Sequence, residues 1–178
     1  MHRTALTYLT KEWLPSAERK PLIIRGARQV GKTWLIRQLA TQSGKTLIEI
    51  NFEKTPQASS LFASNDPHQI LMNLSAFLNK NIEISECLLF LDEIQASPEI
   101  LAKLRWFYEE SPQLPVVSAG SLLEFVFEDH AFSIPVGRIS YLHLEPLSFE
   151  EFLLARDQEV LYEYLQNFQF KDNSEIPK

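Results

Sequence analysis

One segment near the beginning of the chain has the residue types and spacing of a loop that binds phosphate. Residues Gly26–Thr33 have the sequence GARQVGKT, which matches the pattern Gly-x-x-x-x-Gly-Lys-Thr/Ser. Glycines let the backbone adopt torsion angles that other residues avoid, so several N–H groups can point at one anion. Lys32 would then contact the β- and γ-phosphates of a nucleotide, and the Thr33 hydroxyl would bind Mg²⁺. The segment therefore predicts a site for ATP and its magnesium ion.

The sequence on either side of this segment supports the same interpretation. A β-rich run, Leu22–Arg25, precedes it, and an amphipathic helix is predicted to follow it. The alternative is an ordinary glycine-containing turn between a strand and a helix, and the context favours the phosphate loop. Trp34 is most simply a packing residue, although it lies close enough to report on nucleotide binding. We expect nucleotide contacts from Gly26, Ala27, Arg28, Gln29, Val30, Gly31, Lys32, Thr33 and Trp34.

A second candidate for chemistry is a pair of acidic residues that follows a strongly apolar run. Glu86–Asp92 has the sequence ECLLFLD, typical of a strand that is buried on both faces, and Glu93 comes next. In an open parallel sheet, ligands bind beyond the carboxyl ends of the strands. We therefore expect Asp92 to hold Mg²⁺ together with Thr33, and Glu93 to act as the general base. A solvated acidic strand end is the alternative, and the phosphate loop makes the functional interpretation stronger.

The elements that must position these residues alternate along the chain. Short β-rich runs are separated by segments with apolar residues at helical spacing, and this order predicts a parallel sheet covered by helices on both faces. The predicted fold class is accordingly α/β, with three layers. The five expected strands are Leu22–Arg25, Thr46–Phe52, Glu86–Asp92, Leu114–Ala119 and Ile139–Leu144.

Composition excludes several other classes of protein. The chain has 178 residues, a length that is enough for one folded domain with a core. Its apolar fraction of 45% is near the usual value of globular proteins. No run of about 18 apolar residues predicts a membrane span, and the first residues do not have the pattern of a signal peptide. The single cysteine, Cys87, excludes an internal disulfide and fits a cytoplasmic location. The net charge of −6 argues against broad nucleic-acid binding, although basic residues gather in the first quarter of the chain.

Two other kinds of catalytic site find no support. The four histidines, His2, His68, His130 and His143, are scattered and lack the close spacing of a zinc site. A serine or cysteine nucleophile would need a Gly-x-Ser-x-Gly turn, which the sequence does not contain.

The end of the chain differs from the part before it. We expect a core over residues 1–147, a helical extension over 148–170 and a polar tail over 171–178. The extension contains Tyr162, Tyr164, Phe168 and Phe170, so its last helix needs something to pack on. Two alternatives stay open: the helix folds back onto the sheet, or it contacts a missing second domain, another copy or a protein partner.

Five motifs in order resemble a known family. They are RGARQVGKT (Arg25–Thr33), LLFLDEIQ (Leu88–Gln95), SAGS (Ser118–Ser121), VGR (Val136–Arg138) and LEPLSFEEF (Leu144–Phe152). Together they resemble the AAA-type ATPases that carry a C-terminal domain of unknown function called DUF4143. The resemblance implies a P-loop NTPase fold of the AAA or RecA type, with sheet order 5-1-4-3-2. It differs at Ala27, where the family commonly has proline, and the family usually continues well beyond Lys178. We therefore expect a fragment or a solitary ATPase domain that largely lacks the lid over the base.

The resemblance also implies roles for individual residues. Lys32 and Thr33 would bind nucleotide and Mg²⁺, Asp92 would be the metal-side carboxylate and Glu93 the catalytic one. A polar sensor of the γ-phosphate is expected at the end of the fourth strand, where Ser118 and Ser121 are the candidates; Ser121 also fits a helix cap.

Arg138 has a further expected role. Its guanidinium could stabilise charge during phosphoryl transfer, in its own site or in a neighbour's. The alternative is an exposed arginine before an edge strand.

Three functions are compatible with these motifs. The first is hydrolysis of MgATP coupled to remodelling of an unknown partner, which Glu93 favours. The second is a slow nucleotide-dependent binding switch, which the missing lid favours. The third is a GTPase or a small-molecule kinase. It ranks last because the guanine motif Asn-Lys-x-Asp is absent, and Asn79–Ile82 lacks the aspartate.

Overall fold

The computed structural model describes residues 3–121, 123, 135 and 137–168, and the chain divides into two compact units. The sheet unit comprises residues 5–146, and the helical unit comprises residues 1–4 and 147–178. The expected polar tail, residues 171–178, lies outside the described residues, as do Phe170 and Val136.

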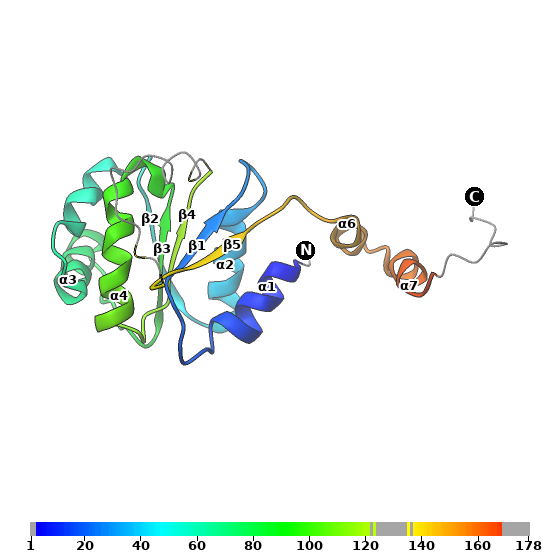
Figure 1. Ribbon diagram of the computed structural model, residues 1–178, viewed down its shortest axis with the longest axis horizontal. Coiled ribbons are helices and arrows are strands. Elements are labelled where there is room, and N and C mark those ends of the chain that lie inside the picture. The colour runs from blue at the N-terminus through cyan, green and yellow to red at the C-terminus, as the bar shows by residue number, and fades with distance from the viewer. Residues whose placement is uncertain (1–2, 122, 124–134, 136, 169–178) are drawn as a thin grey trace. The chain divides into compact units, whose positions relative to one another are not determined.

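The sheet unit contains five parallel strands in the order β2-β3-β4-β1-β5, which confirms the predicted order (Figure 1). The strands follow the apolar runs of the sequence, each within two residues of the predicted bounds. The strands are β1 (Leu22–Arg25), β2 (Thr46–Asn51), β3 (Cys87–Asp92), β4 (Val116–Ala119) and β5 (Ser140–His143).

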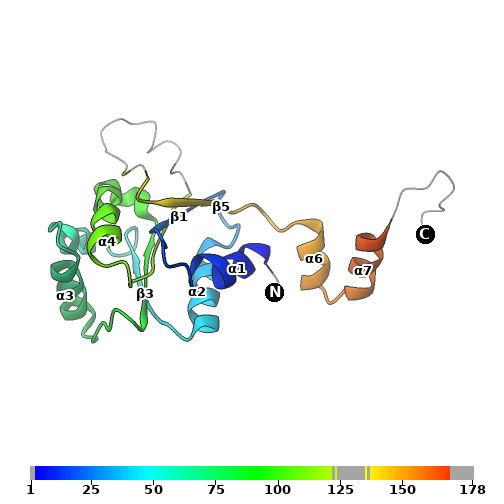
Figure 2. The same ribbon diagram turned by 60° about the horizontal axis from the view of Figure 1, so that its bottom comes forward.

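Helices cover both faces of this sheet, which makes three layers (Figures 1 and 2). One face carries α3 (Pro67–Leu78) and α4 (Leu104–Glu110), and the other carries α1 (Thr4–Tyr8) and α2 (Lys32–Ser43). Neighbouring residues of one strand point to opposite faces, so Leu89 packs beneath α3 and α4 whereas Phe90 packs beneath α2. All six residues of β3 are buried, as the apolar run requires.

Local sequence signals explain where several helices begin and end. Asp66 caps α3, because its Oδ1 accepts a hydrogen bond from the backbone N–H of His68 at 2.8 Å. Gly44 ends α2 in the left-handed conformation with φ of 68°. The predicted helix after Ser97 begins as a 3₁₀ helix over Pro98–Lys103 and becomes α-helical only at Leu104.

Three helical segments were not predicted. The chain forms a π-helical turn over Leu9–Trp13 directly after α1, and 3₁₀ helices over Pro56–Phe62 and Ile94–Ala96. The first of these matters for the core, because the Trp13 ring is buried beside α2 and its Nε1 donates to the carbonyl of Lys20 at 3.0 Å. None of the helices in the described ranges is long and apolar enough to cross a membrane.

The helical unit consists of α6 (Phe149–Ala155) and α7 (Glu159–Asn167) together with the first residues of the chain. Ser148 and Glu151 form a capping box at the start of α6, with each side chain bonded to the other's backbone N–H. Glu151 also pairs with Arg3 at 3.3 Å and accepts from the backbone N–H of Thr4.

A substitution in β3 tests the packing beneath α2. Phe90 is 0% exposed, so Phe90→Ala removes a ring that fills the core and should lower the free energy of unfolding by about 3–5 kcal/mol. The matched control is Met72→Ala, because Met72 is 66% exposed on α3 and its loss should change stability by less than about 0.5 kcal/mol. Urea unfolding measures both; equal losses would contradict the layer arrangement.

Candidate functional site

The carboxyl ends of β1 and β3 bring the two predicted motifs together. The loop Gly26–Gly31 joins β1 to α2, and Asp92 is the last residue of β3. Thr33 Oγ1 donates a hydrogen bond to Asp92 Oδ2 at 3.2 Å, across 59 residues of sequence. Asn51 Nδ2, from the end of β2, donates to the same oxygen at 3.1 Å. The candidate site is therefore built at the carboxyl ends of three parallel strands, β1, β2 and β3.

The loop itself depends on its first glycine. Gly26 has φ of 141°, and a Cβ atom placed on it would lie 2.2 Å from the carbonyl oxygen of Leu144. Leu144 is fixed there because its N–H donates to the carbonyl of Arg25 at 2.8 Å. No residue with a side chain fits this approach without backbone movement, so Gly26 is required by the end of β5 as well as by the loop.

Lys32 lies within the curve of the loop. Its Nζ donates to the carbonyls of Gly26 and Ala27 at 2.9 and 2.8 Å, and its side chain is only 8% exposed. A buried ammonium needs such partners because desolvation of an unpaired charge is costly. Phosphate oxygens would compete with these two carbonyls, since they carry negative charge and form stronger charge-assisted bonds.

A cavity of about 390 Å³ opens beside the loop. Besides predicted residues it is lined by Glu53, which follows β2 and was not predicted. Gly26, Ala27 and Val30 belong to the loop but do not line the cavity. The lining residues are Arg28, Gln29, Gly31, Lys32, Thr33, Trp34, Glu53, Glu93 and Ser121.

The donors and acceptors around this cavity fit a nucleotide phosphate with Mg²⁺. Lys32 and the loop supply positive charge and backbone N–H groups for phosphate, while Thr33 and Asp92 supply the oxygen ligands that Mg²⁺ prefers. Within the described residues no group of three or more His, Cys, Asp or Glu could enclose a metal ion. Mg²⁺ usually takes one or two protein ligands together with phosphates and water.

The environment of Asp92 shows a balance of opposing effects. Burial raises the pKa of this carboxyl most, and the nearby charge of Glu93 raises it further. The hydrogen bonds from Asn51 and Thr33 act in the opposite direction. Burial thus disfavours the charged form of Asp92. A cation bound beside this carboxylate would offset that cost.

Two residues at the site have left-handed backbones without being glycine. Gln29 has φ of 65° and Glu93 has φ of 52°. Such conformations cost roughly 1–2 kcal/mol per residue and are concentrated at functional sites. Both strained positions lie on the cavity, one on each motif.

The remaining predicted residues are placed differently from one another. Ser121 lines the cavity, and its Oγ accepts from Arg28 Nε at 3.4 Å. Ser118 is fully buried within β4, points to the face covered by α3 and α4, and does not line the cavity. The geometry therefore supports Ser121 and not Ser118 as the polar group at the site.

Arg138 lies at the opposite end of the strands from the phosphate loop. It precedes the amino end of β5, whereas the phosphate loop follows the carboxyl end of β1, which pairs with β5 in parallel. Its Nε pairs with Glu109 Oε1 at 3.0 Å at the end of α4. A role in its own site is not supported by this geometry, and a role in a neighbour's site stays a prediction.

Sequence reasoning missed three polar side chains at the site, namely Asn51, Glu53 and Gln95. Asn51 and Glu53 could have been found, because they end and follow a predicted strand whose carboxyl end meets that of β3. Gln95 follows Glu93 by two residues, but its contacts depend on the left-handed turn at Glu93, which no local pattern predicts.

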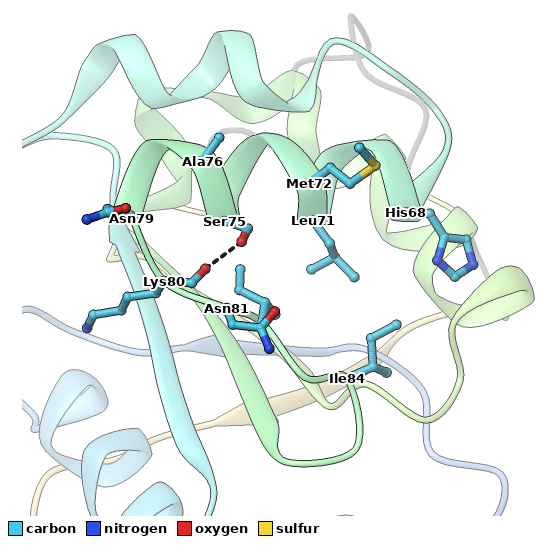
Figure 3. A pocket seen from close by; sticks show the side chains of 10 residues that line it. His68, Leu71, Met72, Ser75, Ala76, Asn79, Lys80, Asn81 and Ile84 are labelled. Atoms are coloured by element: carbon cyan, nitrogen blue, oxygen red, sulfur yellow. Dashed lines mark hydrogen bonds between the residues drawn. The ribbon is translucent and has the colours of Figure 1, made fainter.

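A larger hollow of about 730 Å³ lies elsewhere, between α3 and the segment after it. Figure 3 shows the Ser75 hydroxyl bonded to the Lys80 carbonyl across it, with Met72 and Leu71 above and Ile84 below. None of its lining residues is an aspartate or a glutamate, so it lacks the carboxylates that metal-dependent phosphoryl chemistry uses.

The fold and the site together define the class of protein. A parallel sheet of order 5-1-4-3-2, with a phosphate loop between β1 and α2 and an acidic pair after β3, is a P-loop NTPase fold.

The comparisons then give the family. The chain belongs to the AAA domain family, whose sequence model matches residues 18–153. Among solved structures it is similar to a chain of Drosophila ORC bound to DNA, with 17% identity and a TM-score of 0.53. That similarity covers 92% of this chain and 48% of the other, so this chain spans about half of the ORC chain. No match was found among proteins with curated functions.

The first prediction at this site concerns Gly26. Gly26→Ala should abolish ATP binding, because the new methyl group would meet the Leu144 carbonyl and displace the loop. The matched control is Gly44→Ala: that glycine also has positive φ but nothing within 4 Å, so the variant should lose about 1 kcal/mol of stability and keep its affinity. Calorimetric titration with MgATP distinguishes them, and equal affinities would disprove the role of Gly26.

The second prediction concerns the buried charge of Asp92. Asp92→Asn keeps an oxygen that can accept from Thr33 and Asn51 but removes the charge, so without nucleotide it should raise stability by about 1 kcal/mol. The folded protein holds the Asp92 proton more tightly than the unfolded chain does, because burial raises this pKa. Wild-type stability therefore falls as pH rises from the ordinary value of an aspartate to the raised one.

The stability advantage of Asp92→Asn over wild type should thus grow with pH in that window. Denaturant unfolding at a series of pH values measures it. The same variant should lose the extra stabilisation by ATP that Mg²⁺ provides. An advantage that shrinks as pH rises would contradict the assignment.

Proposed function

We propose that this chain binds MgATP and hydrolyses it to ADP and phosphate, and that the reaction drives a change in a partner molecule. The observation that carries the proposal is the contact between Thr33 and Asp92, which joins the phosphate loop to the acidic pair. Membership of the AAA domain family supports it independently.

Each residue has a distinct part in the proposed reaction. The loop amides and Lys32 hold the phosphates, while Thr33 and Asp92 hold Mg²⁺, which when bound would neutralise charge on the phosphate oxygens. Glu93 accepts a proton from a water molecule as the water oxygen bonds to the γ-phosphorus. The bond from that phosphorus to the bridging oxygen breaks, and ADP leaves with the electron pair. Ser121, joined to the loop through Arg28, is the proposed sensor of the γ-phosphate.

A slow nucleotide-dependent switch is the second candidate, and two contacts favour it. The Nζ of Lys32 is held by two carbonyls of its own loop, those of Gly26 and Ala27. Lys32 must exchange these partners for phosphate oxygens before the reaction, which would slow turnover in this domain by itself.

The proposed partner contact involves the helical unit. Within that unit the rings of Phe149 and Phe152 stack with centroids 6.5 Å apart and remain exposed, and α7 has no buried residue. We propose that this surface contacts a protein, either another copy or a further domain such as DUF4143. The matched family model ends at residue 153, so the further domain rests on the sequence resemblance alone. A cytoplasmic location is proposed because the sequence has a single cysteine, Cys87, and nucleic acid is not part of the proposal.

Single-turnover phosphate release tests the hydrolytic role. Glu93→Gln should slow the release by at least about 100-fold, because the amide cannot accept the proton, and should leave MgATP affinity unchanged. Lys32→Ala is the binding control and should lose affinity. Equal release rates for wild type and Glu93→Gln would refute hydrolysis by Glu93 and leave the switch. GTP that displaces ATP with equal potency would favour a GTPase.

A further inference from the structure

The side chain of Gln95 connects the two carboxylates that face the cavity. Its Nε2 donates to Glu93 Oε2 at 2.6 Å and to Glu53 Oε1 at 3.3 Å. Glu53 and Glu93 come from different strand ends, and both line the cavity with Lys32 and Thr33. Two like charges repel each other, so an amide donor between them offsets part of that repulsion. The contact to Glu93 is short, as expected for a bond to a charged acceptor.

The oxygen end of the Gln95 amide lies against Gly120, the residue that follows β4. Because Nε2 must face two carboxylates, Oε1 points away from them; it is buried and has no hydrogen-bond partner among the described residues. A Cβ atom placed on Gly120, the residue after β4, would lie 2.3 Å from Oε1. Gly120 has no positive φ, so its lack of a side chain serves the close approach of neighbouring side chains, those of Gln95 and of Leu123, whose Cγ would lie 2.9 Å from the added Cβ.

We propose that Gln95 is the positioning residue for Glu93: it fixes one oxygen of this carboxylate so that the other faces the cavity, and Gly120 holds Gln95 in place. The inference rests on the proposed hydrolytic function of Glu93. It assigns to the sequence Asp-Glu-Ile-Gln a third functional side chain that the acidic pair alone does not reveal.

The backbone at Glu93 explains why such a residue is needed. Glu93 has φ of 52° and ψ of 47°. The direction of its side chain is therefore set by a strained turn after β3 and not by a helix or strand. A glutamate side chain has three rotatable bonds, and fixing it before the reaction removes an entropic cost from the chemical step. A neutral amide does this without the strong loss of basicity that a lysine or arginine partner would cause.

The same contacts link Glu93 to the far side of the cavity. Gly120 is followed by Ser121, whose Oγ accepts from Arg28 in the phosphate loop. A shift of Ser121 therefore moves Gly120 against Gln95, and Gln95 carries the shift to Glu93. This path gives a sensor at Ser121 a physical means of changing the orientation of the general base.

The hydrogen bond itself is tested by NMR of side-chain amides, which needs no turnover. Gln95→Leu identifies the amide signals of Gln95 by their disappearance. One of these protons should be shifted downfield in the wild-type protein, and the shift should be lost in Glu93→Ala. A Gln95 signal in the ordinary glutamine range that does not respond to Glu93→Ala would overturn the proposal.

The functional role is tested by a double-mutant cycle with Glu93→Gln. Gln95→Leu should slow single-turnover phosphate release by on the order of 10- to 100-fold, while MgATP affinity changes by less than about threefold. In the Glu93→Gln background the same substitution should change the rate by less than about twofold, because Gln95 acts only through Glu93. Gln42→Leu, at an exposed glutamine of α2, is the matched control and should have no effect.

A third variant tests the contact with β4. Gly120→Ala should reproduce the loss of rate seen in Gln95→Leu. In the Gln95→Ala background, which has no side-chain oxygen for the new methyl group to meet, Gly120→Ala should cause little further loss. Equal slowing by Gln95→Leu with and without Glu93 would show a merely structural role and overturn the inference. If Glu93→Gln has no effect at all, the proposed hydrolysis fails, and the NMR result still decides whether Gln95 orients Glu93.

Discussion

The contact between Thr33 and Asp92 is the constraint on which the rest of the site depends. The two residues lie on different elements, one in the first turn of α2 and one at the end of β3, and β4 separates β3 from β1 in the sheet. The contact forms only because all these strands are parallel and end at one edge. If β1 and β3 ran antiparallel, the same two sequence motifs would lie at opposite ends of the sheet.

This edge of the sheet concentrates features that oppose stability. Asp92 is a buried charge, Gln29 and Glu93 have left-handed backbones, and Lys32 lies almost fully inside the protein. Each feature costs free energy in a protein whose total stability is only on the order of 10 kcal/mol. The two hydrophobic layers, with β3 buried on both faces between them, offset these costs. The core is therefore what permits a strained and charged site.

Much of the fold could be predicted because it rests on local patterns. Apolar runs marked all five strands, and the loop sequence together with the family resemblance gave their order. The 3₁₀ helix over Pro56–Phe62 was missed because one short helical turn leaves little periodicity in a sequence.

The site was less predictable than the sheet, for a physical reason. The phosphate loop and the acidic pair are contiguous motifs, so they were found from sequence alone. Asn51 bonds to a partner that is distant in sequence, and Gln95 bonds to Glu93 across a turn. Ser118 lies within β4 and Ser121 lies beyond its end, so the choice between them depends on where β4 ends. The role of Arg138 was predicted from the chemistry of its guanidinium, whereas its position at the amino end of β5 follows from the parallel pairing of β5 with β1.

The position of the Leu144 carbonyl against Gly26 has a consequence for how the protein is made. β1 lies between β4 and β5, so both of its neighbours leave the ribosome after it does. A nascent chain that ends before β5 already contains the whole sequence GARQVGKT, yet it lacks the carbonyl that closes over the first glycine. The loop thus reaches its final surroundings only after Leu144 has been synthesised and the fifth strand has joined the sheet.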